Sequence, residues 1–462
     1  MSQFKREFMP LYSYYDRSGM ARHLEEMAAK GWMLEKLGAW SWRYRRTEPQ
    51  KLRFSITYFP TASQFDPGPG EGLETLRDYC AQAGWTLAAD NAQVQVFYSG
   101  DENAVPIETD PGAEFANIRR AMKRSFLPNM VSLLLLSLLE LGFLFWQFLN
   151  DPVKKLSSPT SFYSALGWLP LFLLVSAELF RYFRWQKRAG AAVEAGAPLP
   201  ELRSSRTLSA LVLAATGLML FLELFAAFQL SPRILFVMLG SLLYVLLLIV
   251  LANAAKSVMR RRGVRARTNR LVTFALIVAL SIAMPVGMTA LILHNSWSFR
   301  ENAAETYEYK GMTWSVYHDP IPLEIADLTD TGYTQWSTTA DENVTFLLAF
   351  RTYNQCPRMD ALDQPDLAYD IVEVRCPALY GLCEKAMLER YWYDHEPAYR
   401  DTYYPVDAAP WGAEKVYQMY FMNETPSNRY LLCWPDRIVE LRLDWEPTPE
   451  QMAKAGDLLK TA

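Results

Sequence analysis

Three acidic side chains interrupt long apolar segments, where an ionised group is costly. Glu140, Glu178 and Glu223 lie in runs that are otherwise rich in Leu, Phe and Ala. A charge at the centre of a bilayer costs about 2.5 to 3.5 kcal/mol on insertion scales, whereas each Leu or Phe gains only about 0.3 to 0.6 kcal/mol. The chemistry open to such a carboxyl is proton sharing, cation binding or hydrogen bonding between helices.

The three glutamates differ in their depth. Glu178 lies near the end of its segment and within a turn of Arg181, so pairing with that cation explains its presence. Glu140 and Glu223 fall near the midpoints of their segments. We hypothesise that these two face the interior of a helix bundle and share a proton or bind a cationic ligand. Hydrogen bonding by protonated carboxyls is an equally open interpretation.

The elements that position these glutamates are five apolar stretches. A helix needs about 20 residues to cross a hydrocarbon core of about 30 Å, and all its backbone polar groups are then satisfied internally. Five stretches reach that length: residues 127–149, 162–180, 207–230, 234–255 and 271–293. The sequence therefore predicts an integral membrane α-helical bundle of about five transmembrane helices, over residues 127–294, with the lipid bilayer as its first partner.

The distribution of Lys and Arg predicts the orientation of this bundle. Basic residues gather in residues 111–126, which we interpret as a basic juxtamembrane linker, and again in the loops after the second and fourth stretches. The two opposite loops hold only Lys154, Lys155 and Arg233. Because basic loops remain in the cytoplasm, we expect a multi-pass protein of the cell membrane. Its amino terminus is cytoplasmic and its carboxy terminus is extracytoplasmic.

Residues 1–110 alternate between strand and helix signals. An aromatic stretch over residues 11–15 is expected as the first strand, helices near residues 19–30 and 72–83, and further strands over residues 32–44, 51–59 and up to Tyr98. This β-α-β-β-α-β order predicts a cytoplasmic ferredoxin-like α+β domain.

A Gly-Trp pair follows each of these two helices, at Trp32 and Trp85. These rings either anchor the helices on the sheet or, where exposed, form an interaction surface.

The first hundred residues also resemble a known family. The run from Leu24 to Leu34, LEEMAAKGWML, is followed by an aromatic strand and by the strand from Phe54 to Phe59. This pattern resembles the domain of unknown function family 2812. The resemblance implies a bacterial protein, largely from Gram-positive species, whose domain is followed by membrane helices. Some members lie beside small transcriptional regulators, which implies signalling, but the family brings no assigned activity and no catalytic residue.

Residues 295–462 predict a second, extracytoplasmic α+β domain. Apolar alternation predicts strands over residues 344–353, 415–422, 429–433 and 437–445, and a final helix begins with Thr448 as its N-cap. Four of the five cysteines lie here, at Cys356, Cys376, Cys383 and Cys433. They form either two disulfides, with three pairings open, or reduced buried thiols.

The same domain holds an aromatic run from Tyr391 to Tyr404 that includes His395. This run lines a ligand surface or packs as an edge strand.

Recognisable catalytic motifs are missing from the sequence. It contains no phosphate loop, dinucleotide fingerprint or zinc-protease motif, and only four histidines. We therefore expect no enzyme, no cofactor, no metal site and no nucleic-acid partner. The leading hypothesis is a sensory or regulatory membrane protein that couples an extracytoplasmic domain to a cytoplasmic domain and its regulatory protein partner. The alternative is a transporter or ion-handling protein that uses Glu140 and Glu223, and a homo-oligomer is compatible with both.

Overall fold

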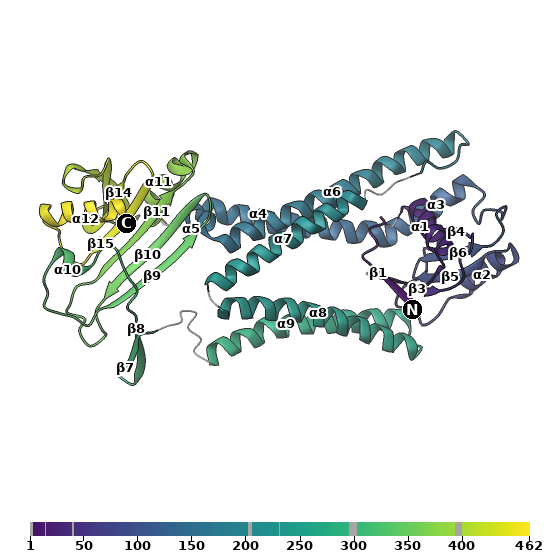
Figure 1. Cartoon of the computed structure of the whole chain (residues 1–462), viewed down its shortest axis with the longest axis horizontal. Helices are drawn as coiled ribbons and strands as arrows, with labels where there is room; N and C mark the ends of the chain where they lie inside the picture. The colour runs from purple at the N-terminus through teal and green to yellow at the C-terminus, as the bar shows by residue number, and fades with distance from the viewer. Residues whose placement is uncertain are drawn as a thin grey trace. The chain divides into compact units, whose positions relative to one another are not determined.

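The computed structural model of the protein describes residues 3–13, 15–38, 41–201, 206–230, 232–294, 303–392 and 400–462. Figure 1 shows its elements in chain order. The chain divides into two compact units. The first comprises residues 1–139, 167–218 and 236–297, and the second comprises residues 140–166, 219–235 and 298–462. Each unit combines one globular region with parts of the long helices.

Five long apolar helices separate an N-terminal α+β region from a C-terminal antiparallel β-sheet domain. They are α4 (Leu127–Asn150), α6 (Pro159–Glu194), α7 (Arg206–Leu230), α8 (Pro232–Arg261) and α9 (Ala266–His294). Their boundaries contain the five predicted stretches. Each is long and apolar enough to cross a membrane, which identifies candidate spans of a multi-pass membrane protein.

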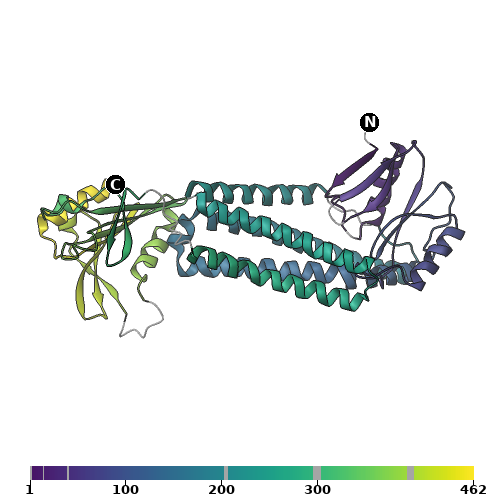
Figure 2. The ribbon, with the colours of Figure 1, turned by 90° about the horizontal axis from the view of Figure 1, so that it is seen from below.

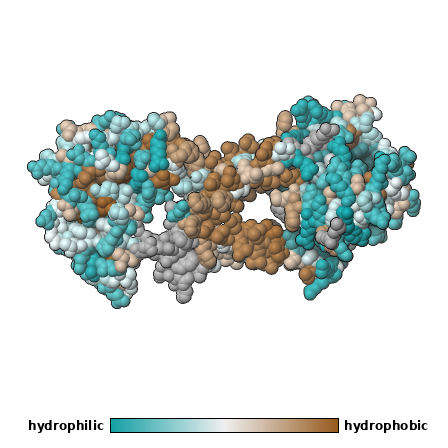
Figure 3. Space-filling view, in the orientation of Figure 1, coloured by the Kyte–Doolittle hydropathy of each residue, from teal (hydrophilic) through white to brown (hydrophobic). Residues whose placement is uncertain are grey.

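Apolar side chains on these helices remain exposed. Leu139 on α4, Leu243 on α8 and Phe274 on α9 are 71%, 68% and 65% exposed. Apolar (brown) residues gather over the helices in Figure 3, whereas the globular regions are mainly hydrophilic. Water would penalise so much apolar surface, but lipid would not. Pro170 and Pro285 lie inside α6 and α9, and both helices continue through them.

Residues 111–126, predicted as a linker, are helical. They form α3 (Pro111–Ala121) and the π-helical segment η1 (Met122–Phe126), which leads directly into α4. Asp110 caps α3 by accepting from the backbone N–H groups of Gly112 and Ala113. The first span is therefore the continuation of a helix that begins in the N-terminal region.

The N-terminal region contains two antiparallel sheets of three strands each. The first has the order β1-β3-β2, with β1 (Phe4–Phe8), β2 (Trp32–Leu37) and β3 (Ser41–Arg46). The second has the order β4-β6-β5, with β4 (Arg53–Tyr58), β5 (Thr86–Asn91) and β6 (Val94–Ser99). Helix α1 (Arg17–Ala29) follows β1, and α2 (Glu71–Gln82) follows β4. Figure 2 shows the strands of the first sheet in purple near the N-terminus.

These two sheets correct the predicted ferredoxin-like arrangement of one four-stranded sheet. The expected strand over residues 32–44 is in fact two strands, β2 and β3, which pair antiparallel. The Gly38 N–H donates to the Ser41 carbonyl at 3.1 Å, and a Cβ at Gly38 would lie 2.6 Å from that oxygen. A glycine is therefore needed at this position.

The two halves of this region repeat one β-α-β-β plan. A shift of 53 residues takes Gly31 onto Gly84 and carries β3 onto β6. Both glycines have positive φ, at 78° and 82°, and end their helices with the left-handed residue that favours glycine. The register also shifts at matching places, between Leu34 and Lys36 and between Leu87 and Ala89. The predicted correspondence of the two Gly-Trp helix exits is confirmed.

The C-terminal domain is built on a seven-stranded antiparallel sheet of order β12-β13-β14-β15-β11-β10-β9. Its strands are β9 (Ser337–Val344), β10 (Leu348–Cys356), β11 (Leu367–Val374), β12 (Thr402–Val406), β13 (Lys415–Phe421), β14 (Thr425–Cys433) and β15 (Arg437–Leu443). A separate hairpin pairs β7 (Glu305–Tyr309) with β8 (Met312–Val316). The predicted strand over residues 344–353 spans the turn between β9 and β10, and the other three predicted strands match β13, β14 and β15.

Both faces of this sheet are covered. One face packs with α10 (Ile325–Leu328), the 3₁₀ turn η4 (Ala409–Trp411) and α12 (Pro449–Thr461) around residues such as Leu432 and Leu441. The other face packs with α5 (Pro152–Ser157), the 3₁₀ turn η2 (Pro377–Leu379) and α11 (Tyr380–Leu388) around Leu431 and Ile438. Because neighbouring strand residues point to opposite faces, Leu431 and Leu432 enter different cores.

Candidate functional site

The first unit joins its globular region to the helices through Glu178 on α6. Tyr15 donates to Glu178 Oε2 at 2.6 Å, and Ser13 donates to the same oxygen at 2.7 Å. Arg181 lies 3.3 Å from Glu178 Oε1. The Glu178 side chain is only 11% exposed. A buried carboxylate is tolerated when hydrogen bonds and a cation compensate its lost hydration, so this residue acts as a polar link between α6 and the segment before α1.

Aromatic packing surrounds that link. Tyr182, one turn after Glu178, is fully buried, and its ring lies 5.9 Å from the ring of Tyr15. Phe126 at the end of η1 contacts both rings, with centroids 5.3 Å from Tyr15 and 5.5 Å from Tyr182. The entry of α4 and the polar end of α6 therefore share one core with the N-terminal sheets.

The loop from Phe59 to Gly70 contacts the ends of α8 and α9. Lys256 on α8 donates to Gln64 Oε1 at 2.9 Å, and the buried Asn269 on α9 donates to the Phe65 carbonyl at 3.3 Å. Two cations lie over the Phe65 ring: Lys256 Nζ at 5.9 Å and the Arg270 guanidinium carbon at 5.6 Å from the ring centroid. Another contact between the helices and the N-terminal region does not involve this loop: Arg206 at the start of α7 donates to the Tyr12 hydroxyl at 2.9 Å.

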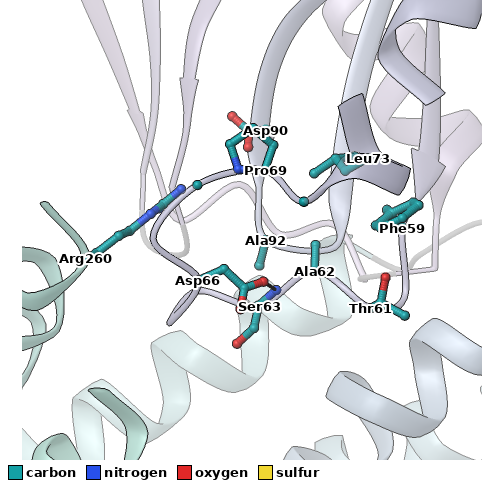
Figure 4. Close-up of a pocket in the computed structure, with 12 residues that line it drawn as sticks. Phe59, Thr61, Ala62, Ser63, Asp66, Pro69, Leu73, Asp90, Ala92 and Arg260 are labelled. Atoms are coloured by element: carbon teal, nitrogen blue, oxygen red, sulfur yellow. Dashed lines mark hydrogen bonds between the residues drawn. The ribbon is translucent and has the colours of Figure 1, made fainter. Parts of the chain in front are cut away.

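A small pocket of about 100 Å³ lies within this loop. Figure 4 shows Arg260 of α8 reaching toward the loop from one side, with Asp90 and Leu73 on another. The backbone N–H of Ser63 donates to Asp66 Oδ2 at 2.7 Å, which closes the turn. This pocket is small, and Arg260 at the basic end of α8 forms one side of it.

Glu140 and Glu223 are half-buried, on α4 and α7. Among the described residues, no hydrogen bond or ion pair of Glu140 or Glu223 is found. The hypothesis that they share a proton or a cation stays a prediction.

Trp85 is buried, which agrees with its interpretation as a packing anchor and not with an exposed interaction surface. It is 3% exposed, packs with Cys80, Phe97 and Ala104, and donates through Nε1 to the Val105 carbonyl at 2.8 Å. Its amphipathic ring is thus satisfied inside the domain. Trp32 is half-buried, and the Arg46 guanidinium lies over its ring at 4.9 Å. Of these two tryptophans, Trp32 is the one that is partly exposed.

The second unit contains a buried ionic cluster that sequence reasoning missed. Arg390, just after α11, lies 2.5 Å from both Asp370 Oδ2 on β11 and Glu440 Oε2 on β15. Tyr403 on β12 donates to Glu440 Oε1 at 2.7 Å. Glu440 is only 5% exposed. One signal was present in the sequence, since Glu440 interrupts the apolar run of β15.

The surroundings of this cluster maintain its charges. Burial alone would lower the pKa of Arg390, but Glu440 and Asp370 outweigh burial and raise that pKa above its ordinary value. Burial and the neighbouring Glu440 raise the pKa of Tyr391 to about 12. The arginine therefore stays protonated and the tyrosine stays neutral at physiological pH.

A pocket of about 310 Å³ opens beside the cluster. The Arg429 guanidinium lies over the Tyr391 ring at 4.5 Å and 4.0 Å from Glu440. Lys154 of α5, Thr352 and Asn354 of β10, and Arg442 of β15 complete its polar lining. Such a concave site with a few convergent polar groups suits a small polar ligand.

The sheet of this unit is attached to the segment between the first and second spans. Thr345 Oγ1 donates to the Leu156 carbonyl of α5 at 2.8 Å, and the ring of Phe346 lies 5.3 Å from that of Phe162 at the start of α6. Val153 of α5 is 3% exposed in the core around Leu348 and Met387. The pocket beside Arg390 is therefore next to α5, the segment that connects α4 to α6, and both lie on the same face of the sheet.

The cysteines of this domain are free thiols. Cys383 and Cys433 are buried, Cys376 is half-buried and Cys356 is exposed, so none of the predicted disulfide pairings is formed. The predicted aromatic run extends from Tyr391 to Tyr404. Its residues 393–399, which include His395, lie outside the described residues. In the described part of the chain, no group of three or more His, Cys, Asp or Glu side chains is arranged to hold a metal ion.

Comparison with known proteins gives one match. Neither a curated protein nor a solved structure matches the chain. Residues 18–130 match the family described as "Protein of unknown function (DUF2812)". The match begins at α1, includes both sheets from β2 onward, and extends through α3 and η1 into α4. The chain therefore carries a DUF2812 domain at residues 18–130, and the family gives no function to it.

Proposed function

We propose that this chain is a non-enzymatic bacterial membrane protein with a sensory or regulatory role. In this proposal the C-terminal sheet domain is extracytoplasmic and receives a small polar ligand in the pocket beside Arg390. The DUF2812 domain is cytoplasmic and binds a regulatory protein, and the protein functions as a monomer or a homo-oligomer. The helices carry the change of state between the two domains.

The charge pattern of the loops supports this orientation. The last turn of α8 and the connection that follows it contain Arg260, Arg261, Arg262 and Arg265 and no acid. The connection that contains α5 has two lysines, Lys154 and Lys155, and one acid, Asp151. Basic connections stay in the cytoplasm because their translocation is disfavoured.

One observation carries the coupling role. A single continuous helix, α6, has tertiary contacts with both globular regions: Phe162 packs against Phe346 of the sheet domain, and Glu178 accepts hydrogen bonds from Tyr15 and Ser13 of the N-terminal region. A helix transmits displacement because its backbone hydrogen bonds make it stiff along its axis. A simple anchor would not need specific polar contacts of this kind.

Hydrogen exchange of the full-length protein in lipid nanodiscs tests this proposal. The variant Thr345→Val with Phe346→Ala loosens the attachment of the sheet to α5 and α6. Exchange in peptides around Ser13 and Tyr15 should then differ from that of the wild type by severalfold. Phe421→Ala, which removes another exposed aromatic ring on the same sheet, is the control. Unchanged exchange in residues 3–130, with increased exchange in α5, would contradict the coupling.

The alternative is a transporter or ion-handling protein, and the half-buried carboxyls of Glu140 and Glu223 favour it. Carboxyls inside apolar helices commonly mark ion pathways. Replacing both with Gln should abolish proton or cation flux in proteoliposomes if this alternative holds. The regulatory proposal instead expects no flux in either protein.

A further inference from the structure

A third pocket, larger than the two described above, lies where the N-terminal region meets the candidate spans. It encloses about 490 Å³, within the range of about 300–1,000 Å³ that is typical of small-molecule sites. Its walls come from the loop over residues 60–65, from Ala92 and Gln93 between β5 and β6, from Arg124, Ser125 and Asn129 at the entry of α4, and from Arg270 on α9. All these residues belong to the first unit.

The lining of this pocket is positively charged. Arg124 and Arg270 supply two guanidinium groups, and none of the lining residues is acidic. The other polar side chains are hydroxyls and amides: Thr61, Ser63, Gln64, Gln93, Ser125 and Asn129. Guanidinium groups bind phosphate oxygens through paired, charge-assisted hydrogen bonds, and hydroxyl and amide groups add further donors. This set of side chains fits an anion better than it fits a cation or an apolar ligand.

Two contacts hold these cations in position. Arg124 donates one hydrogen bond to the Pro60 carbonyl at 3.0 Å, which uses one of the five N–H donors of its guanidinium. The Arg270 guanidinium lies 5.6 Å from the Phe65 ring centroid. Gln93 donates to the same Pro60 carbonyl at 2.9 Å, so the wall formed by Pro60 is itself fixed. The site is therefore organised before any ligand arrives.

The pocket also lies at a defined level of the helices. Arg124 precedes the apolar stretch of α4 at Leu127 by three residues, and Arg270 is followed directly by Leu271. Phe274, one turn after Arg270, is 65% exposed. Charged groups at such a boundary meet the phosphates of the lipid headgroups, while the neighbouring apolar side chains face the acyl chains.

We propose that this pocket binds a phosphate group through Arg124 and Arg270, at the level of the lipid headgroups on the side of the N-terminal region. An anionic phospholipid is one source of this group, and a free phosphate in solution is the other. This site is independent of the proposed sensory role, because it involves neither the ionic cluster of the sheet domain nor the intramembrane glutamates.

The test uses the full-length protein, purified in detergent and incubated with phosphatidylglycerol, with phosphatidylcholine or with inorganic phosphate. Native mass spectrometry counts the lipid that each protein retains. The variant Arg124→Gln with Arg270→Gln should retain phosphatidylglycerol with an affinity at least about tenfold lower than that of the wild type. The control is Arg120→Gln with Arg267→Gln, which removes the same charge from exposed positions on α3 and α9 outside the pocket.

The outcomes separate the two sources of the phosphate group. Preference for phosphatidylglycerol over phosphatidylcholine, lost in the pocket variant and kept in the control, supports a lipid site. Displacement of the lipid by inorganic phosphate, with the same dependence on both arginines, supports a site for free phosphate. Equal losses in the pocket variant and the control would indicate general surface charge and overturn the proposal, and so would the absence of any loss. Size-exclusion chromatography and circular dichroism establish that each variant is folded.

Discussion

Tyr15 and Glu178 are separated by 163 positions in the chain, yet the hydroxyl of Tyr15 lies 2.6 Å from the carboxylate of Glu178. Tyr15 belongs to the segment before α1, and Glu178 belongs to the second candidate span. This hydrogen bond compensates the cost of burying the Glu178 carboxylate in an apolar helix. It also attaches the N-terminal region to α6. Its strength therefore affects how firmly the N-terminal region is held on its helices.

Tyr15→Phe should weaken this attachment. Hydrogen bonds to charged groups contribute about 1.5 to 3 kcal/mol, so the opening free energy of the segment around Tyr15 should fall by about that amount. Hydrogen exchange of its peptides measures the change. Tyr79→Phe, at a residue of α2 that is 67% exposed, should have no comparable effect. Equal protection in the two variants would show that Ser13 and Arg181 suffice to hold Glu178.

Glu440→Gln should destabilise the sheet domain much more than a change at a surface pair. Removing one partner of a buried ion pair typically costs about 3 to 5 kcal/mol, because the remaining charge stays buried without compensation. Arg442→Gln, on the same strand, breaks a pair whose arginine is 45% exposed and should cost less than about 1 kcal/mol. Urea unfolding followed by Trp fluorescence compares them. A small effect of Glu440→Gln would mean that water reaches the cluster.

Glu7 should make the N-terminal region sensitive to acid. Burial alone would raise the pKa of Glu7, but its hydrogen bonds with His23 at 2.7 Å and Tyr44 at 2.8 Å outweigh burial and lower that pKa. A carboxyl with a lowered pKa stabilises the fold fully above its unfolded value of about 4.3. This stability is lost as the pH falls through the folded pKa.

Glu7→Gln therefore should be less stable than the wild type at pH 6, and the difference should shrink below about pH 4.3. Melting temperatures measured from pH 6 to pH 3 provide the comparison. A difference that grows on acidification would contradict the assigned sign.

The four thiols of the sheet domain should react at different rates. Burial raises the pKa of Cys383 to about 11, and burial, together with Glu384, raises the pKa of Cys433 to about 12. Thiolates are the reactive form, so both should resist alkylation at pH 8. Burial and Asp366 also raise the pKa of Cys356, but its exposed sulfur should still react before these two buried thiols. Peptide mass spectrometry after iodoacetamide treatment gives the order. A peptide in which Cys376 is linked to Cys383, found without reduction, would instead support the disulfide prediction.

Gly456→Ala should disrupt α12. A Cβ at Gly456 would collide with the backbone carbonyl of Trp411, which cannot move without shifting η4. Overpacking of this kind typically costs about 1 to 3 kcal/mol. Gly381→Ala on α11 has no atom within 4 Å of the new Cβ and should be neutral or stabilising, as alanine is in most helices. The melting temperature should therefore fall in Gly456→Ala and stay equal or rise in Gly381→Ala, and an equal fall in both variants would contradict the assigned collision.

Several elements were predictable because one local rule determines each of them. The five long helices follow from length and apolar composition, since a backbone surrounded by lipid must satisfy its hydrogen bonds internally, as a helix does. Helix α12 begins where Thr448 and Gln451 form a capping box with Pro449 in the first turn. In the repeated half-domains, the left-handed Gly31 and Gly84 end their helices as the sequence indicates.

Other features depend on distant partners, and the sequence does not reveal them. The antiparallel pair of β2 and β3 was hidden in a run of aromatic residues that reads as one strand. The cluster around Arg390 unites residues that are 20 and 50 positions apart, on elements whose order in the sheet no periodicity predicts. The sequence left the burial of Trp85 open, because part of its cover, Ala104 and the Val105 carbonyl, comes from the segment after β6.

The two edge strands of the seven-stranded sheet contain residues that disfavour pairing with a further strand. Among the strands that the structure describes in this sheet, β12 and β9 are the two with one side unpaired by a neighbouring strand. Pro405 lies within β12, and Asp341 and Glu342 lie within β9. A proline has no N–H to offer an incoming strand, and adjacent carboxylates repel a second copy of themselves. Both edges thus discourage strand addition between copies of the domain, which protects it from edge-to-edge aggregation.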